Sequence, residues 1–139
     1  MGKIHPTIRV TTQDAANLLD GIVSTGLGQM RRAPAQLGGV GKFPILRGIQ
    51  AGTVRYERSD PDEHWQTWGE LVDQLQRTGR AKGDCEDLAS AVAAELLFNG
   101  IPARTYVYRS GPQLYHVVVK TERWGFLDPS RAAGMESNG

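Results

Sequence analysis

The feature that most constrains the fold is a change of hydrophobic period near Pro102. Before it, the stretch from about Asp84 to Phe98 carries apolar residues at helical spacing, and Asn99-Gly100 forms a typical helix end. After it, apolar and polar residues alternate, as in strands. The alternating runs are Ala103 to Tyr108, Leu114 to Lys120, and Trp124 to Asp128. This order predicts an α+β fold, with helices packed on a small antiparallel sheet.

Two further helices are expected upstream. Residues 11 to 24 show helical spacing behind Thr12, which can act as a cap. A second helix is predicted to begin at Asp60, because Asp60-Pro61-Asp62-Glu63 combines a capping carboxylate, a proline at the first helical position and a capping-box glutamate. It should end at Gly79. Its apolar face comprises Trp65, Trp68, Leu71, Val72 and Leu75.

The segment from Gly26 to Gly52 contains seven glycines and two prolines without a clear period. This composition predicts an irregular, partly extended segment that wraps the domain or contacts an assembly partner. A chain of 139 residues is the size of one domain. We therefore expect a single domain over 1–139, in which residues 1–53 supply the first helix and this segment, and residues 54–130 form the core that carries the motifs.

Composition argues against several functions. A net charge of +1 provides no excess positive field for nucleic acid, so we expect no nucleic-acid partner. No apolar run approaches the ~20 residues of a membrane span, and the stretch after Met1 lacks the apolar core of a signal peptide. With one cysteine, no internal disulfide can form. These observations favour a protein kept in a reducing cytoplasm, without membrane contact.

No cofactor or metal is expected. The run Gly38 to Phe43 is close to a phosphate-binding loop, but the first required glycine falls on Gln36, and Phe43 replaces the magnesium-binding Ser or Thr. Zinc sites usually contain paired local ligands such as Cys-x-x-Cys, which the sequence lacks.

The only cysteine, Cys85, lies in Gly83-Asp84-Cys85-Glu86-Asp87-Leu88-Ala89 at the predicted start of a helix. A helix N-terminus or a neighbouring imidazolium lowers a thiol pKa and favours the nucleophilic thiolate. His116 and Asp128 follow on predicted strands. A three-residue loop centred on Glu122 would place them directly opposite each other, with Cβ atoms ~5 Å apart, whereas a two-residue turn would make them diagonal neighbours. Either arrangement gives Cys85 a candidate base with an orienting carboxylate.

In such a site, His116 would accept the thiol proton and later return it, while Asp128 would fix the tautomer. The backbone N–H of Cys85 can face a developing oxyanion, and the indole N–H of Trp65 or Trp68 is a candidate second donor or substrate wall. The alternatives are that Cys85 is an inert core thiol, that both tryptophans are core residues, and that Asp128 only ends a strand.

Three blocks of the sequence resemble the transglutaminase-like superfamily, which has a papain-like fold. They are Gly83 to Ala89, Tyr115-His116-Val117-Val118, and Phe126-Leu127-Asp128-Pro129-Ser130. The stretch from Val54-Arg55-Tyr56 to Asp60-Pro61, followed by Trp65, is similar to the bacterial and phage transglutaminase-like cysteine peptidases. The resemblance covers residues 54 to 130.

The resemblance implies a catalytic triad of Cys85, His116 and Asp128 that performs acyl transfer through a thioester. The reaction would be hydrolysis of a protein or peptide substrate, or transfer of an amine to a glutamine side chain. Because the superfamily includes proteins of phage particles, the alternative is a structural or assembly protein, such as a phage virion component, that retains the fold with or without activity. The expected location is cytoplasmic or virion-associated.

Overall fold

The helix that begins at Cys85 is the centre of the fold. A computed structural model describes residues 12–32, 42–58, 65–111 and 114–135. The elements in chain order are α1 (Thr12–Arg32), α3 (Pro44–Ala51), β1 (Val54–Tyr56), α4 (Trp68–Thr78), β2 (Ala81–Gly83), α5 (Cys85–Phe98), β3 (Ala103–Gly111), β4 (Leu114–Thr121), β5 (Gly125–Leu127) and α6 (Pro129–Ala132). The mixture of helices and small sheets confirms the predicted α+β class.

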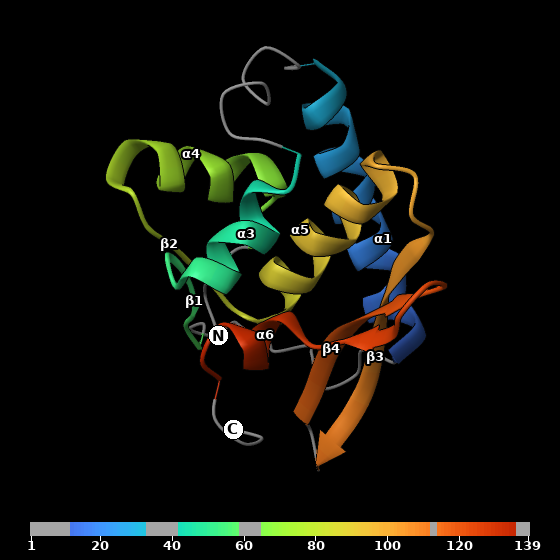
Figure 1. The fold of residues 1–139 in the computed structure, drawn as a ribbon. Helices are drawn as coiled ribbons and strands as arrows, with labels where there is room; N and C mark the ends of the chain where they lie inside the picture. The colour runs from blue at the N-terminus through green and yellow to red at the C-terminus, as the bar shows by residue number, and fades with distance from the viewer. Residues whose placement is uncertain (1–11, 33–41, 59–64, 112–113, 136–139) are drawn as a thin grey trace, which may run out of the picture.

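Helix α5 is surrounded by other elements (Figure 1). Every residue from Asp87 to Leu96 is buried, because α1 packs along one side, α3 and α4 lie on another, and β3 and β4 pack against the helix as well. The N-cap is Asp84, whose side chain accepts a hydrogen bond from the backbone N–H of Asp87 at 3.0 Å. Both the cap and the helix end agree with the prediction. The helix is more deeply buried than the single apolar face expected from its sequence.

Two sheets flank the helices. Strands β3, β4 and β5 form the predicted antiparallel sheet in that order, and Val107, Val117 and Val119 pack against the core. The second sheet is a parallel pair of β1 and β2, in which Tyr56 lies opposite Gly83. Neither strand of this pair is among the strands predicted from the sequence. This pairing brings β1 beside the residues that lead into α5.

The prediction of an irregular segment over residues 26–52 was wrong for the described residues. Helix α1 continues to Arg32, and α3 occupies Pro44–Ala51; residues 33–41 lie outside the described part. Glycine here permits close packing: a Cβ on Gly26 would lie 3.1 Å from the Trp68 Cβ and 3.2 Å from the Ala94 Cβ. Because Met30 and Ile45 belong to the same buried cluster as α5, these helices are part of the core.

The second helix does not run continuously from Asp60 to Gly79 as predicted. Residues 59–64 lie outside the described part, but Trp65 to Thr67 are not helical and α4 begins at Trp68. Thr67 and Glu70 form a complete capping box, in which each side chain accepts a hydrogen bond from the backbone N–H of the other. The preceding Gln66 donates its backbone N–H to Asp87 at 2.7 Å, which holds the chain outside the helix. The predicted helix end at Gly79 is confirmed.

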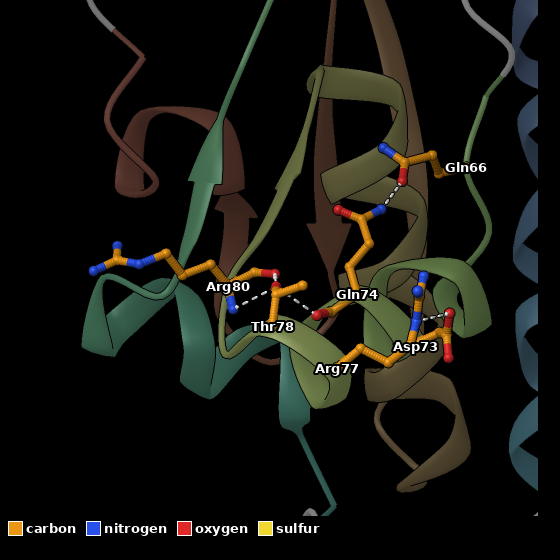
Figure 2. Close-up of polar contacts among 6 residues, drawn as sticks. All are labelled: Gln66, Asp73, Gln74, Arg77, Thr78 and Arg80. Atoms are coloured by element: carbon orange, nitrogen blue, oxygen red, sulfur yellow. Dashed lines mark hydrogen bonds and ion pairs between the residues drawn. The ribbon is translucent and has the colours of Figure 1, made fainter.

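Side-chain contacts connect α4 to its surroundings (Figure 2). The amide of Gln74 bonds to the amide of Gln66, and the Thr78 hydroxyl lies 2.8 Å from both the Gln74 and Arg80 carbonyl oxygens. Arg77 and Asp73 form an exposed ion pair one turn apart at 2.9 Å. The glutamine pair therefore ties the middle of α4 to the segment beside the N-terminus of α5.

The turn between β4 and β5 is centred one residue later than the predicted three-residue loop. Val119 pairs with Leu127 and Thr121 with Gly125, so the three-residue loop is centred on Arg123, not Glu122. Gly125, at φ 75°, supplies the left-handed residue that such a loop favours. His116 and Asp128 are consequently diagonal neighbours on one face of the sheet.

None of the helices in the described ranges has the length and apolar character that a membrane span requires.

Candidate active site

Cys85 is the first residue of α5 and is partly buried against the core. A backbone hydrogen bond from Val117 reaches its thiol. Strand β5 ends at Leu127, opposite Val119, so it no longer covers β4 at Val117. The Val117 contact therefore places the Cys85 sulfur beside β4, the strand that carries His116.

His116 and Asp128 meet directly. The Nε2 atom of His116 lies 2.9 Å from Oδ2 of Asp128, which confirms the predicted hydrogen bond between them. Asp128 is held from its other side, because it caps α6 by accepting the Arg131 backbone N–H at 3.2 Å, and the Arg131 Nε lies 3.4 Å from Oδ2. His116 is only 4% exposed, and the Tyr108 ring packs edge-on against it with centroids 5.6 Å apart. These contacts fix the imidazole.

A helix N-terminus favours the thiolate, but at Cys85 other effects raise the thiol pKa overall. Burial raises the pKa of Cys85 well above its usual value, and the negative charges of Glu86 and Asp84 raise it further. The Val117 hydrogen bond lowers this pKa without reversing the shift. The thiol also lies 3.6 Å from Oε1 of Glu86, as a donor to that carboxylate. The resting site therefore holds a protonated thiol at neutral pH.

The carboxylates next to Cys85 are themselves perturbed. Burial, followed by the charge of Asp84, raises the pKa of Glu86 to about 8. The same two causes, in the same order, raise the pKa of Asp87 to about 7, although hydrogen bonds from Gln66 oppose the shift. From sequence, the net effect of these acids on Cys85 could not be given a sign. The structure shows that Glu86 disfavours the thiolate.

The two tryptophans differ in what their positions permit. Trp68 is 5% exposed, and its indole N–H donates to Oε2 of Glu95 at 2.8 Å. Its proposed role as an oxyanion donor is therefore wrong, since that N–H already has a partner in the core. Trp65 precedes α4, is partly buried and packs against the core. An oxyanion or substrate-wall role for Trp65 stays a prediction.

Tyr56 is a neighbour of the site that sequence reasoning did not select. Burial raises its pKa first, and the charge of Cys85 is the second cause, ahead of Asp84. The tyrosine therefore lies close enough to sense the thiol. Its proximity depends on the parallel pairing of β1 with β2, which has no distinctive sequence signal. Arg131, by contrast, could have been found from its i+3 spacing after Asp128.

The arrangement combines a sulfur nucleophile that contacts β4 at Val117, an imidazole on the preceding residue of the same strand, and a carboxylate that orients the imidazole. Because Nε2 is bound to Asp128, Nδ1 is the nitrogen left to exchange a proton. Within the described ranges, no group of three or more His, Cys, Asp and Glu side chains is placed to hold a metal ion. No protein-family model, curated protein or solved structure matches the chain.

Proposed function

We propose that this protein is a cysteine-dependent acyl transferase or peptidase with a papain-like, transglutaminase-like fold. The observation that carries the proposal is the 2.9 Å contact between His116 and Asp128 on a strand whose next residue, Val117, binds the Cys85 thiol. A buried imidazole with a fixed carboxylate partner is the usual means of activating a thiol. The resemblance of the three sequence blocks to transglutaminase-like proteins adds support.

The proposed reaction begins with proton transfer from the Cys85 sulfur to Nδ1 of His116. Asp128 stabilises the imidazolium through Nε2. The thiolate attacks the carbonyl carbon of a peptide or amide, and the backbone N–H of Cys85 faces the resulting oxyanion. The carbon–nitrogen bond then breaks, the leaving amine takes the proton from His116, and a thioester remains on Cys85. Water completes hydrolysis, whereas a second amine completes transfer.

The raised pKa of Cys85 determines how the proposed site works. A permanent thiolate–imidazolium pair would require a depressed thiol pKa, which burial and Glu86 prevent. Proton transfer to His116 would therefore accompany nucleophilic attack. Because the pKa of Glu86 is about 8, this side chain is mainly protonated near pH 7, and its negative charge opposes the thiolate more strongly as pH rises.

Alkylation of the thiol tests this proposal cleanly, because the chain contains one cysteine. We would measure the rate of iodoacetamide labelling from pH 5 to 10 for the wild type and for His116→Ala, with Cys85→Ala as the blank. If His116 assists deprotonation, its removal should slow labelling near pH 7.5 by on the order of a hundredfold. The two rates should converge at high pH, where the thiol ionises without help.

Arg77→Ala is the matched control, because Arg77 forms an exposed ion pair on α4 that does not contact the site. Its labelling profile should match the wild type. Superimposable profiles for the wild type and His116→Ala would contradict the proposed role of His116.

The second candidate is a structural or assembly protein that retains the fold, including a phage virion component. The observation in its favour is the protonated resting thiol beside Glu86, which is unusual for an efficient nucleophile. The described parts of residues 26–52 give it little support, since Met30, Ile45 and Ile49 are buried in the core. Assembly that survives Cys85→Ala with its biological effect intact would favour this candidate over the enzyme.

A further inference from the structure

The outer face of the three-stranded sheet carries an aromatic groove. Tyr106 and Tyr108 of β3 share this face with Val118 of β4 and Phe126 of β5, according to the observed register and the alternation of strand side chains. The groove has a volume of about 290 Å³. Its lining residues are Tyr106, Tyr108, Val118, Phe126, Leu127 and Asp128. Tyr106 and Phe126 pack edge-to-face, 5.3 Å between centroids, yet both are exposed.

Two residues that line this groove also contact His116 of the candidate active site. Asp128 forms part of its wall and at the same time bonds to His116. Tyr108 also lines the groove while its ring packs against the imidazole. A side chain seated over Val118 would therefore lie next to the groups proposed to move the proton.

Two basic residues lie at the opposite end of the face, where Glu122 lines the same hollow. Arg104 and Lys120 lie directly across from each other on β3 and β4. Among the described residues neither forms an ion pair; instead, Arg104 approaches the Tyr106 ring at 6.0 Å and Lys120 the Phe126 ring at 5.8 Å. Like charges placed directly opposite in a sheet are destabilising, so this end favours an anionic occupant.

We propose that this face is the substrate subsite and that it takes an extended acidic-aromatic peptide. The inference rests on the proposed function for the position of the scissile bond. Along β4, Val118 is two residues and Lys120 four residues from His116, or about 7 and 13 Å at strand spacing. The preferred peptide therefore carries a large apolar side chain about two residues from the scissile bond and a carboxylate about four residues from it.

Binding to the Cys85→Ala protein tests the subsite without turnover. The probes are fluorescein-labelled hexapeptides with Phe, Ala or Ser at one position and Glu, Gln or Lys two residues away, measured by fluorescence polarisation. The Phe/Glu peptide should bind best. Phe126→Ala and Tyr106→Ala should each weaken its binding about tenfold or more, because burial of an aromatic side chain is lost. Lys120→Glu should move the preference from Glu to Lys.

Two matched controls lie at the neighbouring turn. Trp124 is 52% exposed, similar to Phe126 at 58%, but does not line the groove; Arg123 contacts the Trp124 ring. Trp124→Ala and Arg123→Ala should leave peptide affinity unchanged. The same face could stack bases, so a single-stranded oligonucleotide is tested as well.

The inference is overturned if no hexapeptide binds up to millimolar concentration, or if binding ignores Phe126 and Tyr106. Oligonucleotide binding that depends on these rings, without peptide binding, overturns it too. Such failures leave the His116-dependent alkylation of Cys85 in place. Conversely, if His116→Ala did not slow alkylation of Cys85, the proposed chemistry would be refuted. Peptide binding to the Cys85→Ala protein would still show whether the groove binds peptides.

Discussion

Glu95 should be the most sensitive single position for stability. It is fully buried in the middle of α5, and its carboxylate accepts the backbone N–H groups of Ile45 at 2.7 Å and Leu46 at 3.0 Å. The indole N–H of Trp68 is its third donor, at 2.8 Å. Because the N-cap residue of α3, Phe43, provides no side-chain cap, Glu95 takes that role from another helix. One carboxylate thus joins α3, α4 and α5.

Glu95→Ala would leave two donors, the Ile45 N–H and the Trp68 indole, buried without a partner. Each costs about 1–3 kcal/mol, whereas the partly buried Leu46 N–H can turn to water. Removing a buried acid also relieves its desolvation, which offsets part of the loss. We expect a net destabilisation of about 2–4 kcal/mol, a large share of the ~5–15 kcal/mol typical of a domain.

The assay is urea unfolding followed by circular dichroism at pH 7. Trp68→Phe removes one donor only, so it should cost about 1–2 kcal/mol, and the double variant should show a coupling of about 1–3 kcal/mol with Glu95→Ala. Glu122→Ala, at an exposed turn residue, is the matched control and should stay within about 0.5 kcal/mol of the wild type. If Glu95→Ala lost less than about 1 kcal/mol, or the two sites were additive, the account of a shared buried cap would be refuted.

Three further predictions concern pH, packing and the candidate site. Burial raises the folded-state pKa of Glu95 from 4.5 to about 7, so the stability that the protonated side chain contributes is fully present below pH 4.5 and is lost as pH rises through 7. The free energy of unfolding measured from pH 5 to 8 should therefore fall. The fall should be less steep in Glu95→Gln, which does not ionise at this position. Gly26→Val should cost about 1–3 kcal/mol in thermal unfolding because it crowds Trp68 and Ala94, whereas Gly21→Ala, with open space around its Cβ, should stabilise by up to about 1 kcal/mol; equal effects would contradict the packing argument. Asp128→Asn should slow Cys85 alkylation near neutral pH by more than about tenfold while Arg131→Ala changes it less, and the reverse order would show that Asp128 does not orient His116.

The contact between His116 and Asp128 could be predicted although the register was not. Moving the centre of the loop from Glu122 to Arg123 shifts each β4 partner by two residues, which keeps the same residues on the same face. The pair therefore remained within reach as diagonal neighbours. The start of α5 was similarly robust, because Asp84 and Asp87 form a capping box within one turn.

The rest depended on information that is not local in the sequence. A glycine in the sequence can mark either a break in a helix or a close contact between helices. Only the positions of Trp68 and Ala94 show that Gly26 permits a close contact. From the sequence, Glu95 is expected to be a surface residue because it is charged. Its burial is explained only by the hydrogen bonds from Ile45 and Trp68, which come from distant parts of the chain. The thiol pKa of Cys85 likewise followed from burial, which outweighed the helix N-terminus.

The packing of α1 has a consequence for synthesis of the chain. Its buried residues Leu19, Val23 and Met30 complete a core whose other members come mainly from α5 and the strands after it. On the ribosome, α1 emerges before α4, α5 and β3, the elements on which it packs, so most of the surface it covers is made later. Its apolar side would stay exposed to chaperones and to other nascent chains for most of translation. Folding is therefore expected to be completed late, when α1 docks onto α5 and β3.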